Sequence, residues 1–115
     1  MKILTIVGAR PQFIKAYPVS KAISEYKNIE EVLLHTGQHY DFNLSQIFFS
    51  ELSLKEPNYN LGVGSASHGK QTGEMLRGIE NVIEKESPDL VLIYGDTNST
   101  LAGALSGAKC HIPIA

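Results

Sequence analysis

The chain has little of what marks several protein classes. It contains one cysteine and no tryptophan in 115 residues, and its formal net charge is -2. No apolar run approaches the roughly 20 residues that a membrane-spanning helix needs. A lone cysteine forms no internal disulfide, so Cys110 is expected to be a small apolar residue in a reducing compartment. The weak net charge gives no electrostatic reason to expect binding to nucleic acid or to a membrane surface.

The amino terminus also lacks the apolar core of a secretory signal peptide. The strand-like run at residues 3–7 is too short for one, and Arg10 follows almost at once. We therefore expect a cytoplasmic protein. Hydrophobic residues make up 43% of the chain, which is typical of a single globular unit of this size.

Apolar runs alternate with helical stripes along the whole sequence. Strands are predicted at residues 3–7, 32–36 and 90–94, with a short edge strand near 59–61 and the start of another at 112–115. Helices are predicted at 17–26 (after a turn over 11–16), 41–52, 67–86 and 97–109. This alternation predicts an α/β fold: a Rossmann-like, doubly wound parallel sheet with helices on both faces.

The helical stripes also predict which side chains face the core. In the first helix these are Val19, Ala22, Ile23 and Tyr26, and in the long third helix Met75, Ile79, Val82 and Ile83. Pro88 should end the long helix. Because the sequence stops inside an apolar strand, we expect it to be the amino-terminal part of a longer protein.

Residues 8–15 join the first predicted strand to a helix and carry two cations. Free N–H groups at a helix amino terminus favour an anion, and Arg10 adds a guanidinium that can bind phosphate through two parallel bonds. Lys15 follows as a second cation. The segment therefore fits a phosphate or diphosphate clamp, with solvated surface charges as the alternative. It is neither a dinucleotide-binding loop nor a Walker loop, because the glycines of those patterns are absent.

Asp96 stands at the carboxyl end of a predicted strand, in the tripeptide Gly95-Asp96-Thr97. In open parallel sheets, ligands bind just outside the carboxyl ends of the strands. The carboxylate is therefore either a general acid or base of an active site or the N-cap of the following helix, and the two roles are compatible.

Two histidines and an aspartate, His35, His39 and Asp41, lie at the junction between the second predicted strand and the loop after it. These residue types bind zinc, but four ligands at the spacing of a metal site are not visible. We therefore expect no metal. Gln38 and His39 are better candidates for loop residues that contact a ligand, with local hydrogen bonding in a turn as the alternative.

Three segments, in this order, resemble the non-hydrolysing UDP-N-acetylglucosamine 2-epimerase family. They are Gly8-Ala9-Arg10-Pro11-Gln12-Phe13-Ile14-Lys15, Thr36-Gly37-Gln38-His39 and Gly95-Asp96-Thr97-Asn98-Ser99-Thr100. The likeness extends over essentially the whole chain. Residues 39–41, 48–52 and 101–105 are most similar to a branch that includes archaeal relatives and enzymes acting on UDP-2,3-diacetamido-2,3-dideoxyglucuronic acid.

The resemblance implies a glycosyltransferase-B-like enzyme of two Rossmann-like domains, with a UDP-sugar in the cleft between them and commonly a homodimer. Residues 1–115 would be most of the first domain, and the second, UDP-binding domain would lie beyond Ala115. UDP-N-acetylglucosamine is the implied substrate, interconverted with its manno epimer for surface polysaccharide precursors. The diacetamido-glucuronic acid analogue is the alternative.

The resemblance also implies a mechanism and roles for individual residues. A base removes the proton on sugar carbon 2 as UDP leaves, and UDP adds back after carbon 2 is reprotonated on the other face. Asp96 matches the proton-transfer position, and Arg10 and Lys15 match substrate-binding positions. Gln38 and His39 match a pair that, in some bacterial members, contacts an allosteric UDP-N-acetylglucosamine. No cofactor is needed, because UDP returns to the same sugar skeleton.

Three other functions stay open on the sequence alone. One is a hydrolysing relative that releases UDP and the free epimer. Another is a non-catalytic, flavodoxin-like binding domain. The third is a retaining glycosyltransferase of the same architecture, which would transfer the sugar to an acceptor.

Overall fold

The computed structural model describes residues 1–8, 10–37, 57–63, 67–95 and 97–115, with residues 10 and 11 described by their backbone alone. In chain order, its elements are β1 (Lys2–Val7), α1 (Arg10–Ser24), β2 (Glu30–His35), β3 (Tyr59–Asn60), α3 (His68–Glu86), β4 (Leu90–Ile93) and α4 (Asn98–Lys109). The helix predicted at 41–52 lies outside the described residues.

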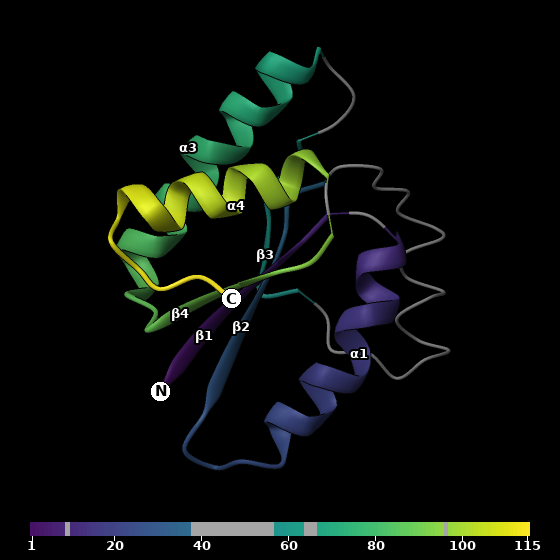
Figure 1. The fold of residues 1–115 in the computed structure, drawn as a ribbon, viewed down its shortest axis with the longest axis vertical. Helices are drawn as coiled ribbons and strands as arrows, with labels where there is room; N and C mark the ends of the chain where they lie inside the picture. Colours follow the sequence, from purple (N-terminus) through teal and green to yellow (C-terminus); the bar gives the residue numbers. More distant parts are fainter. Residues whose placement is uncertain (9, 38–56, 64–66, 96) are drawn as a thin grey trace.

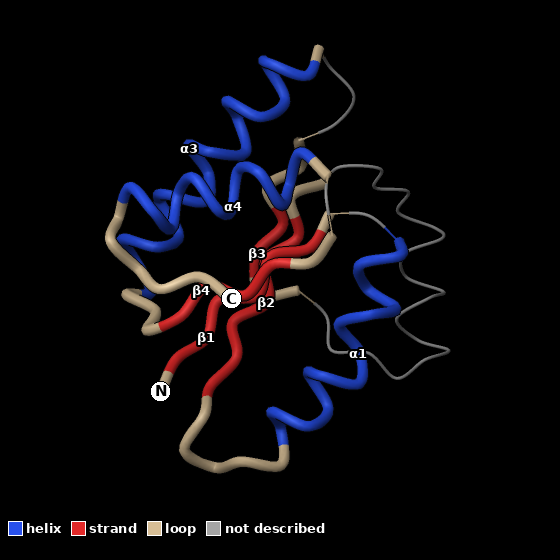
Figure 2. The backbone as a smooth tube through the Cα atoms, viewed as in Figure 1, coloured by secondary structure: helices blue, strands red, loops and turns tan. Residues whose placement is uncertain are grey.

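Within the described part of the chain, four strands form one parallel sheet in the order β3-β2-β1-β4. The register sets Leu4 of β1 opposite Val32 of β2 and Val91 of β4. Helix α1 covers one face, and α3 and α4 cover the other (Figure 1). Figure 2 shows the strands as a single layer between these helices. The predicted Rossmann-like doubly wound sheet is therefore confirmed.

Alternation along the strands divides the core between the two faces. The larger cluster, under α3 and α4, contains Leu4, Ile6, Val32, Leu34, Val63, Met75, Ile79, Val82, Ile83, Val91 and Ala102. The smaller cluster, under α1, contains Val7, Phe13, Ala16 and Leu33. Both faces of β1 and β2 are covered, which explains why these strands read as continuous apolar runs.

Helix α3 agrees closely with its prediction. Its four predicted core residues are all buried, and Ser67 occupies its N-cap position, although without a side-chain capping bond. The helix ends at Glu86, and its C-cap residue Ser87 adopts a left-handed conformation (φ 47°) directly before Pro88. The predicted last strand is present as a short parallel bridge between Ile114 and Val91.

The prediction for α1 was wrong in two respects. Residues 11–16 are helical rather than a turn, and Pro18 lies inside one continuous helix. Proline removes only the bond to the carbonyl four residues earlier, at Ile14. Pro18 and Ile14 are both exposed, so the ring has room and water can reach that carbonyl.

The earlier start of α1 also changes its inward face. Gln12, Phe13 and Ala16 are buried, because they lie in the half of the helix that packs on the sheet. Of the predicted core residues, Val19 is 39% exposed and Tyr26 is 60% exposed, Ala22 is exposed and Ile23 is half-buried. A helical stripe alone could not show which half of the helix meets the sheet.

Candidate functional site

Polar groups gather where β1, β2 and β4 end. Gly8, Thr36 and Tyr94 directly follow these strands, and parallel pairing brings the three positions to the same edge of the sheet. The first turns of α1 and α4 begin at this edge as well. In a sheet of this kind, ligands bind at the carboxyl ends of the strands. This edge is therefore the candidate site.

Gln12 is the centre of the hydrogen bonds at this edge. Its Oε1 accepts the Gly8 N–H at 2.7 Å, and its Nε2 donates to the Tyr94 carbonyl at 2.7 Å. Nε2 also lies 2.9 Å from the hydroxyl of Thr97 and 3.3 Å from that of Thr100. A peptide N–H can only donate and a peptide carbonyl can only accept, so these partners fix which end of the amide is oxygen.

Gly8 lies beneath two hydroxyls from different elements. Thr36 Oγ1, after β2, and Ser99 Oγ, in α4, are 2.8 Å apart in a buried hydrogen bond. A Cβ on Gly8 would lie 2.1 Å from the Ser99 hydroxyl and 2.5 Å from that of Thr36. Glycine is therefore required here because the two side chains close directly over its Cα.

His35 and Gly37 shape the neighbouring end of β2. His35 is buried and packs against Phe13, with ring centroids 4.8 Å apart and ring planes tilted by 46°. Its Nδ1 accepts the Gly37 N–H at 2.7 Å. Burial lowers the pKa of His35 to about 4. Gly37 has φ 92°, and a Cβ there would lie 2.6 Å from the Val63 nitrogen. The imidazole is thus held neutral, and it fixes the turn that leaves β2.

The structure places the predicted site residues to different extents. Arg10 is the first residue of α1, so its backbone stands at this edge, but its side chain lies outside the described part. Lys15 lies further along α1 with an exposed side chain. Asp96, Gln38 and His39 lie outside the described residues. The sequence left open that Asp96 is the N-cap of α4. In the structure, Thr97 occupies the N-cap position of this helix.

Three residues at this edge received no role from the sequence: Gln12, Thr36 and Ser99. Each is polar, buried and within four residues of a strand end or a helix start. That combination was a usable signal, because a buried polar side chain needs partners. The hydrogen-bond partners of these residues come from elements far apart in sequence, so they can be identified only once the order of the strands in the sheet is known.

The described residues contain no cluster of three or more potential metal ligands among histidine, cysteine, aspartate and glutamate. Among the described helices, none combines the length and apolar character required to cross a bilayer.

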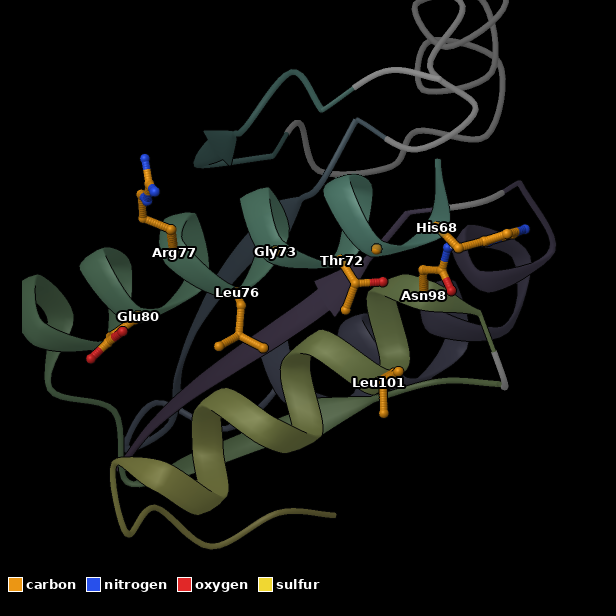
Figure 3. A pocket seen from close by; sticks show the side chains of 9 residues that line it. His68, Thr72, Gly73, Leu76, Arg77, Glu80, Asn98 and Leu101 are labelled. Carbon is orange, nitrogen blue, oxygen red and sulfur yellow. The ribbon is translucent and has the colours of Figure 1, made fainter. Parts of the chain in front are cut away.

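A second surface feature, a groove of about 670 Å³, lies between α3 and α4 (Figure 3). Leu76 and Leu101 contribute apolar surface to it, and Leu101 is 51% exposed. Its two ends differ in chemistry. At one end, the Asn98 amide lies 2.9 Å from Nδ1 of His68, whereas Arg77 and Glu80 stand toward the other end of α3.

The fold defines the class of this chain: an α/β protein with a Rossmann-like parallel sheet, with a candidate site at the carboxyl ends of the strands. A family model described as UDP-N-acetylglucosamine 2-epimerase matches residues 21–115. The chain belongs to that family, which confirms the resemblance seen in its sequence.

Individual relatives match the chain from end to end. A Methanococcus maripaludis protein named UDP-N-acetylglucosamine 2-epimerase homolog is 65% identical over 115 residues, covering 100% of this chain and 32% of that protein. UDP-2,3-diacetamido-2,3-dideoxy-D-glucuronate 2-epimerase of Pseudomonas aeruginosa is 60% identical with the same coverage. The crystal structure of Methanocaldococcus jannaschii UDP-GlcNAc 2-epimerase in complex with UDP-GlcNAc and UDP matches with TM-score 0.94 and 50% identity, covering 100% of this chain and 32% of that one. The chain thus spans about a third of the length of these relatives.

Proposed function

We propose that this chain is most of the first Rossmann-like domain of a UDP-sugar 2-epimerase, acting on UDP-N-acetylglucosamine. The observation that carries the proposal is the match over the whole chain to proteins named for this activity, including 50% identity to a structure with UDP-GlcNAc and UDP bound. The polar edge at the strand ends supports it, because that is where this sheet type binds ligands.

The proposed reaction is an elimination followed by an addition. A base takes the proton from sugar carbon 2 while the bond between carbon 1 and the diphosphate oxygen breaks, which leaves a glycal and UDP. A proton is then delivered to carbon 2 from the opposite face, and the diphosphate oxygen bonds again to carbon 1. Atoms and charge balance without an added oxidant or reductant.

Each predicted residue has a role in this scheme. Asp96 transfers a proton at carbon 2, since a carboxylate can act as general acid or base when its site sets its pKa. Arg10 and Lys15 stabilise the negative charge that develops on the departing diphosphate. Gln38 and His39 are assigned to loop contacts with a bound nucleotide sugar.

A second substrate deserves equal testing. The 60% identity to the diacetamido-glucuronate enzyme, over the whole chain, favours the same reaction on a UDP-sugar that carries two acetamido groups and a carboxylate.

The remainder of the enzyme would supply the second half of the site. The relatives are about three times as long as this chain. With the resemblance, this length supports assigning residues 1–115 to most of the amino-terminal domain of a glycosyltransferase-B-like protein. The second domain would then close over the UDP moiety, opposite the strand-end edge.

We assign the groove between α3 and α4 to a second copy of the protein. Leu101 and Leu105 are exposed large apolar residues one helical turn apart on α4. Arg77 and Glu80 are opposite charges one turn apart on α3, and both are exposed. A two-fold axis through the groove could set Arg77 of each copy against Glu80 of the other. This arrangement would make the enzyme a homodimer.

The test of the activity is proton NMR in deuterated water with the full-length protein. UDP-N-acetylglucosamine and its diacetamido-glucuronic analogue are supplied separately. Deuterium at carbon 2 together with a new epimer signal supports the proposal, and the sugar that reacts identifies the substrate. Free sugar with released UDP would instead indicate a hydrolysing relative. Absence of exchange with both sugars would refute the epimerase function.

A further inference from the structure

Gln12 is a buried polar residue to which the proposed chemistry gives no part. It lies in the first turn of α1 with a side chain only 3% exposed. Its amide reaches from the end of β1 to the end of β4, where the Gly8 N–H and the Tyr94 carbonyl are its partners at 2.7 Å each.

We propose that Gln12 is a positioning residue for the epimerase reaction, and the inference rests on the function proposed above. Its amide sets the spacing between two segments: the one that follows Gly8 and carries Arg10, and the one that follows Tyr94 and carries Asp96.

The sheet itself does not supply this connection. The last register pair between β1 and β4 joins Ile6 to Ile93, so the backbone ladder ends before either segment begins. Beyond that pair, the Gln12 amide bonds to both sides and extends to the hydroxyls of Thr97 and Thr100 at the start of α4. Asp96 lies in the sequence between Tyr94 and Thr97, and Gln12 bonds to both.

The reaction requires such a fixed spacing. The diphosphate must sit on the cations of one segment while carbon 2 faces the carboxylate of the other. A displacement of about 1 Å between groups that act on one substrate can lower the rate by ~100-fold. A side chain that fixes both segments would therefore act on kcat without touching the substrate.

The chemistry of the amide is specific, because one end must accept and the other must donate. In Gln12→Glu the ionised carboxylate would still accept the Gly8 N–H, but it would face the Tyr94 carbonyl oxygen with a second oxygen. Protonation of that carboxyl restores one donor. The four groups named above as bonded to Gln12 are the Gly8 N–H, the Tyr94 carbonyl and the hydroxyls of Thr97 and Thr100, and none of these four titrates near neutral pH.

Three variants of the full-length protein test the proposal. Gln12→Met keeps the length of the side chain and removes its hydrogen bonds. Gln12→Glu makes them depend on pH. Ser106→Ala is the control, since Ser106 is also a buried polar residue (1% exposed) but its hydroxyl donates to the Leu76 carbonyl and joins the later part of α4 to α3 instead. The measured quantities are kcat and KM for deuterium exchange at carbon 2, and hydrogen exchange of the Gly8 amide.

We expect Gln12→Met to lower kcat by ~10–100-fold, with KM changed by less than about threefold, because the loss falls on alignment in the transition state. The Gly8 amide should exchange at least about tenfold faster, since its acceptor is gone. Ser106→Ala should leave kcat and the Gly8 amide close to wild type. In Gln12→Glu, kcat relative to wild type should recover as pH falls, while circular dichroism stays constant. Loss of fold alone would not produce that recovery.

Two results would overturn the inference while leaving the proposed function intact: wild-type kcat in Gln12→Met, or a kcat ratio for Gln12→Glu that does not change with pH. Failure of the proposed function is seen separately, in the wild-type protein, as no deuterium exchange with either sugar. That result would overturn both.

Discussion

The hydroxyl oxygens of Thr36 and Ser99 lie 2.8 Å apart, although 63 residues separate the two in sequence. Their hydrogen bond joins the end of β2 to α4 directly over the Cα of Gly8. Three segments of the chain are therefore fixed relative to one another at the edge of the sheet where we place the active site.

Gly8→Ala should destabilise the protein by about 1–3 kcal/mol, because its Cβ would overlap both hydroxyls and force them apart. Thermal or denaturant unfolding of the full-length protein measures this loss. In the double variant Gly8→Ala/Ser99→Gly, the loss should be smaller than the sum of the two single losses, because one of the overlapping groups is gone. Strict additivity would contradict the close contact.

Stability should fall in mild acid because of His35. Its pKa is about 4 in the folded chain, whereas the ordinary value of 6.5 applies to the unfolded chain. Between pH 4 and 6.5 the unfolded chain therefore binds more protons than the folded chain. The contribution of neutral, buried His35 to the free energy of unfolding is fully present above about pH 6.5 and is lost as the pH falls toward 4. It amounts to ~3 kcal/mol.

His35→Asn is the informative variant for this effect. Its Oδ1 can still accept the Gly37 N–H, as asparagine does in an Asx turn, but it does not titrate. The variant should be less stable at pH 7, since the contact with Phe13 is lost, and its stability should fall less steeply than that of wild type between pH 6.5 and 4. Parallel stability curves for the two proteins would show that His35 is not held neutral by burial.

Two tyrosines should respond oppositely to loss of the hydroxyl. The Tyr94 hydroxyl is buried and has no hydrogen-bond partner among the described residues. Burial, and to a lesser degree the charge of Glu31, raises the pKa of Tyr94 to about 12. Tyr94→Phe should therefore stabilise the protein by about 1 kcal/mol, since it removes an unpaired buried polar group.

Tyr59→Phe is the matched control. The Tyr59 hydroxyl donates to Glu86, and that bond lowers the pKa of the Glu86 carboxyl. Removing the Tyr59 hydroxyl should lower the melting temperature, whereas Tyr94→Phe should raise it. A lower melting temperature in both variants would mean that the Tyr94 hydroxyl makes a hydrogen bond that stabilises the fold about as much as the bond from Tyr59 to Glu86.

The two-fold assignment of the α3–α4 groove predicts that Leu101→Glu weakens dimerisation. The new carboxylates would lie in the apolar part of the interface and lose water there without a partner. Sedimentation velocity should show a dimer for the wild-type protein and a shift toward monomer for the variant. Val19→Glu, at an exposed apolar position on α1 and the opposite face of the sheet, should leave the dimer unchanged. A monomeric wild-type protein would exclude this assignment.

The parts of the fold that could be predicted are those fixed by local pattern. The buried strands and α3 have strong apolar periodicity and clear ends at glycine or proline. Helix α1 was mispredicted, because Pro18 suggested a break that an exposed helix surface does not require. The sequence could not show that only the first half of this helix packs on the sheet.

The candidate site could be predicted only in part, for a related physical reason. The ends of parallel strands share one edge, so Gly8 and the segment around Gly95 could be placed together from the sequence. The bonds that join them could not. Gln12 meets Tyr94 across 82 residues, and that pairing depends on β4 lying next to β1.

The measurement that tests the central claim most directly is the rate of deuterium incorporation at carbon 2 in the Asp96→Asn variant of the full-length protein. Asp89→Asn is its control, since Asp89 lies before β4, at the opposite edge of the sheet, where it accepts the Lys2 N–H at 2.7 Å. We expect a loss of at least ~100-fold for Asp96→Asn, the usual effect of removing a general acid or base, and an unchanged rate for Asp89→Asn. Equal rates in the two variants would contradict proton transfer at the strand-end edge of this chain.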